Sequence, residues 1–577
     1  MTAPTPQPYA VRAVNQYRRR DIFPYLALRY YLANSATLGD RWTPDIAARL
    51  VLRRVDQPYL RVLHFKELGE RGIEHRELHL PCANESIAEA FLLDQCARKR
   101  EFDLPDCVYS YELSGGDETA GVFAPYYAGF KRREQDIERA CQQDPDAVVQ
   151  YLDVRKFYPS VRCEAATRSW LIAAARADLP STVLSLGEKL LSDYQRVPGN
   201  GQGELLTGPM FSHLLGNLIM GDLDREYGSG RTVRYFRYVD DIVLIGPRDA
   251  VHRLHADLVA RLDDLGLKLH PPGSPKHRQQ LARDWLHAVR DLPDDAGRAW
   301  MCLIGDTKRF LLAQPQAKER LASALAAEDF RLPLLDYSEA VRERTFLRRF
   351  RQLKDTRWLR SRLRRASIQS ILSQAHSLRQ LLQQEIERRL GEYSRESGNE
   401  TRNKRIVSRI RFCAGRLAYL GDRGMLPAFA EELRRIDELK FHAEVLHAVG
   451  TCDVTTVVAL GANATQAAGQ VLRAAGLEAE LTHAPEGDGH AMALAVLLMN
   501  GVKVRGANAT DQSEVLELAS VGASVPLMRS TDAFVSEIAC LHGVEPARHP
   551  HIMETAFDED EALPTDAVRD EYSEGSG

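Results

Sequence analysis

Three aspartates of this chain have surroundings suited to binding divalent cations. Asp153 ends a short apolar run, and Asp240 and Asp241 lie between two β-rich runs, Thr232–Tyr238 and Ile242–Ile245. A strand that ends in an acid, beside a hairpin with acids at its turn, brings three carboxylates to one edge of a sheet. Two divalent ions held about 4 Å apart by carboxylates catalyse nucleotidyl transfer to a 3′-hydroxyl. The spacing predicts a site for two Mg²⁺ ions, or Mn²⁺ in their place, although each acid alone also fits a solvated turn or a helix cap.

The sequences around these aspartates resemble the motifs of reverse transcriptases. Residues 153–160, DVRKFYPS, are similar to the family's first catalytic motif, an Asp followed by two aromatic residues. Residues 238–241, YVDD, are similar to its second catalytic motif. Between them, residues 206–213, LTGPMFSH, together with Asn217, resemble the motif that shapes the nucleotide and template pocket. The motifs occur in the family's order, and the resemblance covers residues 100–310.

This resemblance implies roles for five more residues. Tyr158 would be the ring that excludes a ribose 2′-hydroxyl and so selects deoxynucleotides, where the ordinary alternative is a core aromatic. Gly208 would let the backbone approach the incoming base, and Ser212 belongs to the same pocket motif. Lys276 would lie near the leaving pyrophosphate, and Arg132, within the basic run KRR, would contact the triphosphate. A surface location explains these two cations equally well.

This chain departs from the common reverse-transcriptase motifs at some positions, and these departures narrow the group of reverse transcriptases that it resembles. Thr207 and His213 stand where many members have Gln and Pro, and no motif of an RNase H, integrase or homing nuclease is present. The chain is most similar to bacterial Abi-like and defence-associated reverse transcriptases. This implies DNA synthesis from dNTPs on an RNA template, in antiphage defence. It also implies nucleic-acid partners, among them an associated non-coding RNA, and homo-oligomers.

Two other functions stay open. Some Abi-like relatives make DNA without a template and start it on their own tyrosine, for which Tyr393, Tyr419 and Tyr572 are candidates here. In the other alternative, the C-terminal helices form a scaffold or sensor and the catalytic centre is inactive, which the three intact aspartates argue against. The run 115–118, GGDE, imitates diguanylate cyclases but leaves Asp153 unexplained.

Local patterns predict the elements that position the aspartates. After the strand that ends in Asp153, a helix begins near Ser160, and a second helix spans 209–227. The hairpin follows, then an amphipathic helix that ends at Gly266, and finally a strand at Leu267–His270. This order predicts an α+β fold, a small antiparallel sheet with helices on one face. It matches the fingers and palm of a right-hand polymerase.

The rest of the chain is expected to be mainly helical, with a weak repeat. The pentapeptide GANAT occurs at 461–465 and again 45 residues later at 506–510, a period typical of stacked helical repeats, although strands alternating with helices also fit. The predicted organisation is an N-terminal and fingers region (1–150), a palm (151–330), a basic thumb-like helical segment (331–425), a helical-repeat-like domain (426–552) and an acidic disordered tail (553–577).

Charge and composition agree with a nucleic-acid-binding protein of the cytoplasm. The 577 residues carry a net charge of −4, but residues 553–577 contribute −8 through nine acids and one Arg, so the remainder sums to +4. Eleven Lys or Arg lie in 342–365, a candidate nucleic-acid surface. The nine cysteines form no CxxC pair, which favours free thiols in a reducing compartment. No apolar run is long enough for a membrane span.

Overall fold

Helices dominate the chain, and its strands form small sheets. The computed structural model describes residues 7–17, 21–33, 58–69, 72–115, 121–198, 200, 203–274, 276–289, 295–332, 334, 366–395, 400–483, 489–506 and 513–542. Two sheets are antiparallel, and the third is a two-residue parallel pair. The predicted α+β class is confirmed. None of the described helices has the length and apolar character needed to cross a membrane.

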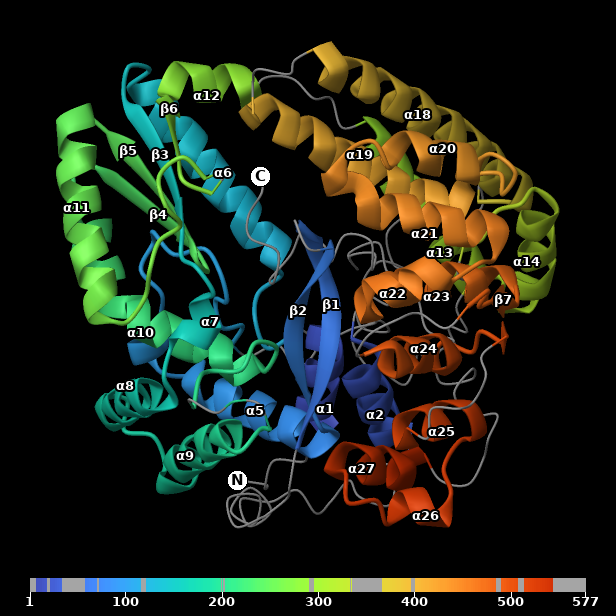
Figure 1. Cartoon of the computed structure of the whole chain (residues 1–577), viewed down its shortest axis with the longest axis horizontal. Helices are drawn as coiled ribbons and strands as arrows, with labels where there is room; N and C mark the ends of the chain where they lie inside the picture. The colour runs from blue at the N-terminus through green and yellow to red at the C-terminus, as the bar shows by residue number, and fades with distance from the viewer. Residues whose placement is uncertain are drawn as a thin grey trace.

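A four-stranded antiparallel sheet is the framework of the candidate site (Figure 1). Its order is β4-β5-β3-β6, with β3 at Val148–Asp153, β4 at Arg234–Tyr238, β5 at Asp241–Gly246 and β6 at Arg278–Leu281. The hairpin predicted from the two β-rich runs is β4–β5, and Val239 and Asp240 form its turn. This part of the sheet follows from local sequence.

Helices cover both faces of this sheet, whereas the sequence predicted helices on one face. Residues 242–245 of β5 are all apolar and fully buried, and alternate side chains point to opposite faces. One face packs on α10 (Met210–Gly228) and α11 (Arg248–Asp264), and the other on α6 (Tyr126–Gln143) and α12 (Ala282–Val289). A strand that is apolar on both sides requires cover on both.

The helix predicted to begin near Ser160 is wrong in its start. A single turn, α7 (Phe157–Ser160), ends at that serine, and α8 (Cys163–Arg176) begins three residues later. Between them the carbonyl of Val161 accepts a 2.8 Å hydrogen bond from the amide of Leu205. Pairing with this distant segment keeps the chain extended where local propensity favoured a helix.

The strand predicted at Leu267–His270 is also wrong. Leu269 forms an isolated bridge to Val154, and the fourth strand is β6, farther along the chain. The preceding helix is as predicted, since α11 ends just before Gly266, whose φ is +76°. After His270 the sequence PPG turns the chain away, because proline cannot donate to a ladder.

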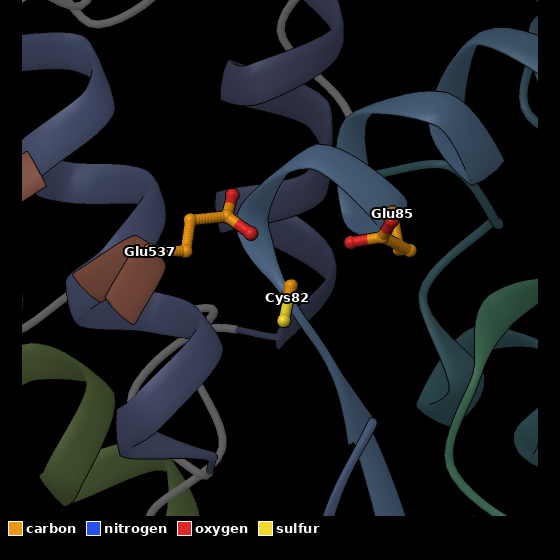
Figure 2. Close-up of side chains that lie close together, drawn as sticks. All are labelled: Cys82, Glu85 and Glu537. Carbon is orange, nitrogen blue, oxygen red and sulfur yellow. The ribbon is translucent and has the colours of Figure 1, made fainter. Parts of the chain in front are cut away.

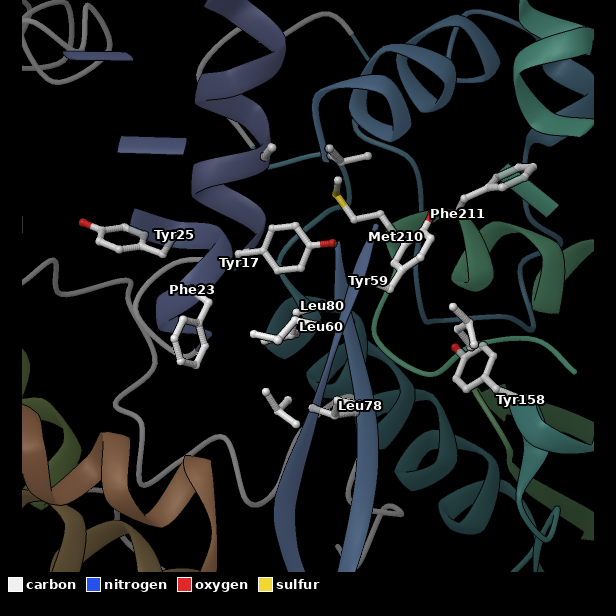
Figure 3. Close-up of a cluster of buried hydrophobic side chains, with 14 of the residues drawn as sticks. Tyr17, Phe23, Tyr25, Tyr59, Leu60, Leu78, Leu80, Tyr158, Met210 and Phe211 are labelled. Atoms are coloured by element: carbon white, nitrogen blue, oxygen red, sulfur yellow. The ribbon is translucent and has the colours of Figure 1, made fainter. Parts of the chain in front are cut away.

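The N-terminal region builds a long hairpin and packs it on helices. Strands β1 (Tyr59–Gly69) and β2 (Gly72–Pro81) pair antiparallel, next to α1 (Gln7–Tyr17), α2 (Ile22–Ala33) and α5 (Ala83–Cys96). Figure 3 shows leucines of the hairpin beside Tyr17, Phe23 and Tyr59. The alternate buried residues of the two strands supply this core.

The C-terminal half of the described chain is helical. Its helices are α13 (Asp295–Ala313), α14 (Lys318–Ala327), α18 (Ile368–Arg395), α19 (Glu400–Leu420), α20 (Leu426–Leu433), α21 (Lys440–Thr451), α22 (Thr455–Leu460), α23 (Ala462–Ala475), α24 (His490–Met499), α25 (Glu514–Val521), α26 (Val525–Met528) and α27 (Ala533–His542). Earlier in the chain, α9 (Ser181–Gln195) follows α8. The parallel pair is β7 (Ala479–Glu480) and β8 (Val504–Arg505). The preference for helices is confirmed for Thr455–Leu460, while the segments near 479 and 504 form this short pair.

Two cores organise these helices. Helices α13, α14, α18, α19 and α20 form one core, to which α21 contributes. Side chains of α21 to α27 instead join the core of the N-terminal helices, the β1–β2 hairpin and one face of the four-stranded sheet. In Figure 1 the hairpin stands between that sheet and helices α22 to α24. Segments about 400 residues apart in sequence therefore share one hydrophobic interior.

Several predictions concern residues outside the described ranges. These are the basic run 342–365, the acidic tail 553–577 with Tyr572, most of the GGDE run, and residues 507–510 of the second GANAT copy. The first copy lies at the junction of α22 and α23, and α23 is capped at its C-terminus by Gly476.

Candidate active site

The antiparallel register places Asp153 directly opposite Asp241. Asp153 is the last residue of β3 and Asp241 the first of β5, and the amide of Val154 donates a 3.1 Å hydrogen bond to the carbonyl of Asp240. Directly opposed residues project side chains on the same face of a sheet, about 5 Å apart. The predicted convergence of the three aspartates at one edge is what the structure has.

Burial and mutual repulsion make this cluster costly as three free carboxylates. Asp153 and Asp241 are each 1% exposed, and Asp240 is partly exposed. Burial raises the pKa of Asp153, and the charges of Asp240 and Asp241 raise it further. Burial also raises the pKa of Asp240 and of Asp241. A bound cation would offset both effects, because its positive charge stabilises the ionised carboxylates.

Two carboxylate oxygens of the cluster suit a cation. Oδ1 of Asp241 and Oδ1 of Asp153 are buried, and neither receives a hydrogen bond from any residue that the structure describes. The second of them, Oδ1 of Asp153, also has a histidine nearby. His270 Nε2 lies 3.2 Å from it, but burial lowers the pKa of His270 to about 4, so the imidazole is neutral at pH 7. On the other side, Arg133 lies 3.7 Å from Oδ2 of Asp241. The donor set is that of a hard divalent ion, so these residues fit Mg²⁺.

The three aspartates are not gathered as tightly as metal ligands. Among the described residues, one group of three His, Cys, Asp or Glu has ligand atoms all within 4.8 Å of one another, and it consists of Cys82, Glu85 and Glu537 (Figure 2). The group that contains Glu537 has a structural explanation, because Glu537 accepts a 2.8 Å hydrogen bond from the Asn84 amide and so caps α5.

The turn that carries Asp240 has a strained backbone at Val239, and both the N–H and the carbonyl of Val239 are hydrogen bonded. Val239 has a φ of +54°, which is unfavourable for a β-branched residue. Its N–H donates to Ser110 Oγ at 2.7 Å, and its carbonyl accepts from Arg237 at 2.8 Å. Arg237 also donates to Asn217 Oδ1 at 2.9 Å. Two side chains therefore fix the backbone immediately before the aspartate pair.

Tyr158, on the turn that follows Asp153, has its ring buried in the hydrophobic core (Figure 3). It is 5% exposed, and its hydroxyl is 2.7 Å from Nδ1 of His213. The His213 ring in turn stacks on Tyr111, with centroids 3.8 Å apart and an interplanar angle of 5°. The histidine that departs from the common family pattern is thus the partner of the predicted selecting tyrosine.

Gly208 and Ser212 have surroundings other than those predicted. Gly208 has a φ of +121°, and a Cβ there would lie 2.7 Å from the carbonyl oxygen of His79. Its close approach is to strand β2, not to open space for a base. Ser212 is fully buried in α10 beside Tyr194, where a substrate cannot reach it.

Of the two predicted cations, Lys276 faces the aspartates and Arg132 does not. Burial lowers the pKa of Lys276, and the carboxylates of Asp153 and Asp240 oppose this, so the ammonium is within their electrostatic reach. Arg132 pairs with Glu112 at 3.1 Å on the rim of a surface cavity of about 340 Å³. Successive helical residues are about 100° apart, so the neighbouring arginine, 133, is the one near Asp241.

The structure adds two cations that the sequence did not indicate. Burial raises the pKa of Asp153, and the charges of Lys276 and Arg76 offset part of this rise. Arg76 lies on β2. Lys66, on β1, repels the like charge of Lys276 and so lowers the pKa of that lysine further. No local pattern marks these residues, because the hairpin meets the aspartates only through tertiary packing.

Sequence comparison adds no family assignment to this geometry. A comparison with models of known protein families found no match, and a search of curated proteins found none either. The assignment of function therefore depends on the arrangement of the site and on the motifs.

Proposed function

We propose that the chain is a reverse transcriptase, an RNA-directed DNA polymerase that uses two Mg²⁺ ions, or Mn²⁺ in their place. The supporting observation is the register that pairs Asp153 with Asp241 and puts Asp240 at the adjoining turn. These three residues would hold the ions. Bound there, the ions would activate the attacking 3′-hydroxyl and neutralise charge on the triphosphate.

In this proposal the four-stranded sheet with α10 and α11 is the palm, and the region before it, with the β1–β2 hairpin, is the fingers. Helices α18 and α19, within the segment 331–425, would be the thumb. The basic run 342–365 would contact the backbone of the RNA template and DNA product, since clustered Lys and Arg bind phosphates.

The chain's own cations would bind the incoming dNTP. Lys276 and Arg76 act electrostatically on Asp153, and Lys66 acts on Lys276, so the loop that carries Lys276 and the hairpin would supply positive charge for the phosphates. Tyr158, held by His213, would block a ribose 2′-hydroxyl and so select deoxynucleotides. The motif resemblance further supports a role in antiphage defence in the cytoplasm, with an associated non-coding RNA and assembly into homo-oligomers.

A template-free, protein-primed reaction has less support. Tyr419 is 1% exposed and its hydroxyl donates to Gln470, so this tyrosine is not presented as a primer. Tyr393 is partly exposed on α18, and burial raises its pKa. The alternative in which the C-terminal helices form a scaffold and the catalytic centre is inactive does not explain the buried aspartate cluster.

The direct test is nucleotide incorporation by purified protein. Labelled dNTPs, Mg²⁺ and a primed RNA template should yield DNA with the wild type, and Asp240→Ala/Asp241→Ala should lower the rate by at least about 100-fold, since metal ligation supplies several kcal/mol. Asp263→Ala/Asp264→Ala is the matched control, because these adjacent aspartates are exposed at the end of α11. Equal loss in both variants, or wild type that incorporates nothing with any template or primer, would refute the proposal. DNA that stays attached to protein after protease treatment and denaturation would instead indicate protein priming.

A further inference from the structure

The first GANAT copy docks on the outer edge of the β1–β2 hairpin. Its glycine, Gly461, joins α22 to α23 with a φ of +116°, and a Cβ there would lie 2.5 Å from the carbonyl oxygen of Leu63 on β1. Such contact with backbone cannot be relieved by a rotamer change. The junction therefore needs glycine in order to approach the strand.

Asn463 of the same copy bonds the strand as a third strand would. Its Oδ1 accepts a 2.8 Å hydrogen bond from the Phe65 amide, and its Nδ2 donates to the Phe65 carbonyl at 3.3 Å. Asn463 is 6% exposed, so both bonds are shielded from water. One side-chain amide thus satisfies both polar groups of an edge-strand residue that would otherwise be buried and unpaired.

The other residues of the junction fix this amide in place. Thr465 Oγ1 donates to the carbonyls of Val457 and Gly461 at 3.0 and 2.8 Å. His75, the partner of Phe65 on β2, has Nε2 3.3 Å from the carbonyl of Ala459. The hairpin is held by α22 and α23 through both of its strands.

Phe65, the residue that Asn463 holds, is followed in the chain by Lys66. Phe65 pairs with His75 and Glu67 pairs with Glu74, so Lys66 is the extra residue of a β-bulge. A bulge redirects a side chain relative to a regular strand. Lys66 acts electrostatically on Lys276, and its amine lies 2.7 Å from Glu67.

Arg76 is one residue along β2 from the partner of Phe65. Arg76, which acts on Asp153, and Lys66, which acts on Lys276, are therefore the immediate neighbours of the Phe65–His75 pair that α22 and α23 contact. A displacement of β1 at Phe65 would move both of them relative to the carboxylates.

We infer that Asn463 and Gly461 are positioning residues for the nucleotide site, and that helices α22 and α23 set where the hairpin cations meet the phosphates of the incoming nucleotide. This inference rests on the proposed function, and it deepens it. The C-terminal helices are part of the site's framework, and the GANAT motif is the point of attachment.

Kinetics of Asn463→Ala test this role. Loss of two buried hydrogen bonds at the strand edge should raise KM for dNTPs by about tenfold with a smaller change in kcat. Gln470→Ala is the matched control, because it removes another buried amide from α23 that bonds Tyr419 and not the hairpin. Both variants should be stable to a similar degree, and only the first should change KM.

A second measurement separates positioning from general damage. If Asn463 acts through Lys66, the variant Lys66→Ala/Asn463→Ala should have a KM close to that of Lys66→Ala alone, since coupled residues are not additive. Hydrogen exchange at the Phe65 amide should be faster in Asn463→Ala than in Gln470→Ala, whatever the activity. Asn463→Ser, which shortens the side chain without burying a charge, should also raise KM and serves if the alanine variant does not fold.

The outcomes are distinct. Active wild type with the same KM in Asn463→Ala and Gln470→Ala, or additive effects in the double variant, would overturn the positioning role and leave the polymerase proposal intact. Wild type that incorporates no nucleotide would overturn the proposed function and the phosphate role together.

Discussion

Arg237 forms a buried ion pair with Asp224, with Nη2 2.7 Å and Nε 2.8 Å from the carboxylate oxygens. Both residues are 1% exposed, and Tyr235 donates to the same carboxylate at 3.0 Å. The pair leaves one guanidinium nitrogen to hold the carbonyl of Val239. An ion pair in the interior thus anchors the turn that carries Asp240.

Arg237 should contribute to stability through its ion pair with Asp224, and to activity through its hydrogen bond to the Val239 carbonyl. Arg237→Met leaves the Asp224 carboxylate buried and unpaired, and should lower the free energy of unfolding by about 3–5 kcal/mol. Arg237→Met/Asp224→Leu should recover much of this loss, because both charges are gone. Denaturant unfolding measures the stability.

Nucleotide incorporation should not recover in the double variant, because the Val239 carbonyl still lacks its donor. Recovery of incorporation in proportion to stability would show that Arg237 only stabilises the fold. Asp222→Leu, an exposed aspartate on the same helix α10, is the control for the leucine substitution.

Selection against ribonucleotides should depend on the Tyr158–His213 pair. Tyr158→Ala should raise the ratio of kcat/KM for rNTPs to that for dNTPs by about 10- to 100-fold, because the pocket loses its steric block. His213→Ala leaves the ring of Tyr158 in place but removes the hydrogen-bond partner of its hydroxyl, and should have a smaller effect in the same direction.

Steady-state incorporation of each nucleotide class checks the two variants. Tyr111→Phe keeps the ring that stacks on His213 and should retain the wild-type ratio. An unchanged ratio in Tyr158→Ala would remove this residue from the nucleotide pocket.

Stability should fall as pH rises because of Glu89. Its carboxyl accepts hydrogen bonds from the amides of Met210 and Phe211 at 2.7 and 3.3 Å, and burial raises its pKa from 4.5 to about 8. The folded state therefore binds a proton that the unfolded state releases between these two pH values. The contribution to stability is complete below about pH 4.5 and is lost as pH approaches 8.

Glu89→Gln should remove this part of the pH dependence and be more stable than wild type near pH 9. Denaturant unfolding from pH 5 to 9 measures both slopes. Glu188→Gln, an exposed residue of α9, should keep the wild-type slope. Parallel slopes in all three proteins would show that Glu89 does not bind this proton.

Mg²⁺ should stabilise the fold through the aspartate cluster. A ligand that binds the native state adds about 2.7 kcal/mol at a concentration of 100 times its Kd. The melting temperature of wild type and of Asp263→Ala/Asp264→Ala should therefore rise with Mg²⁺ and fall again with a chelator. Asp240→Ala/Asp241→Ala should not respond, and an equal rise in this variant would place the stabilising ion elsewhere.

Local sequence was enough to predict the elements around the aspartates. The hairpin turn before Asp241, helix α10 and helix α11 follow from patterns a few residues long, such as β-branched runs and a glycine in the left-handed conformation. The convergence of Asp153 on that turn also follows, because an antiparallel ladder leaves few alternatives for acids at strand ends. The mixed fold class required nothing more.

Other features depend on partners far along the chain. Ser160 ends a turn because Val161 pairs with Leu205, and Arg133 rather than Arg132 meets Asp241 because of how α6 packs on the sheet. Local propensity acts over a few residues and contains no record of such neighbours. These predictions were wrong for that reason.

By itself, the sequence determined the identity and order of the acidic motifs and the elements that carry them. Only the tertiary structure decided that Arg76 acts on Asp153 and that Lys66 acts on Lys276, since both come from a hairpin that Asn463 holds from about 400 residues away. Electrostatic and hydrogen-bond energies depend on distance in space, and the chain's order does not specify that distance until the fold has formed.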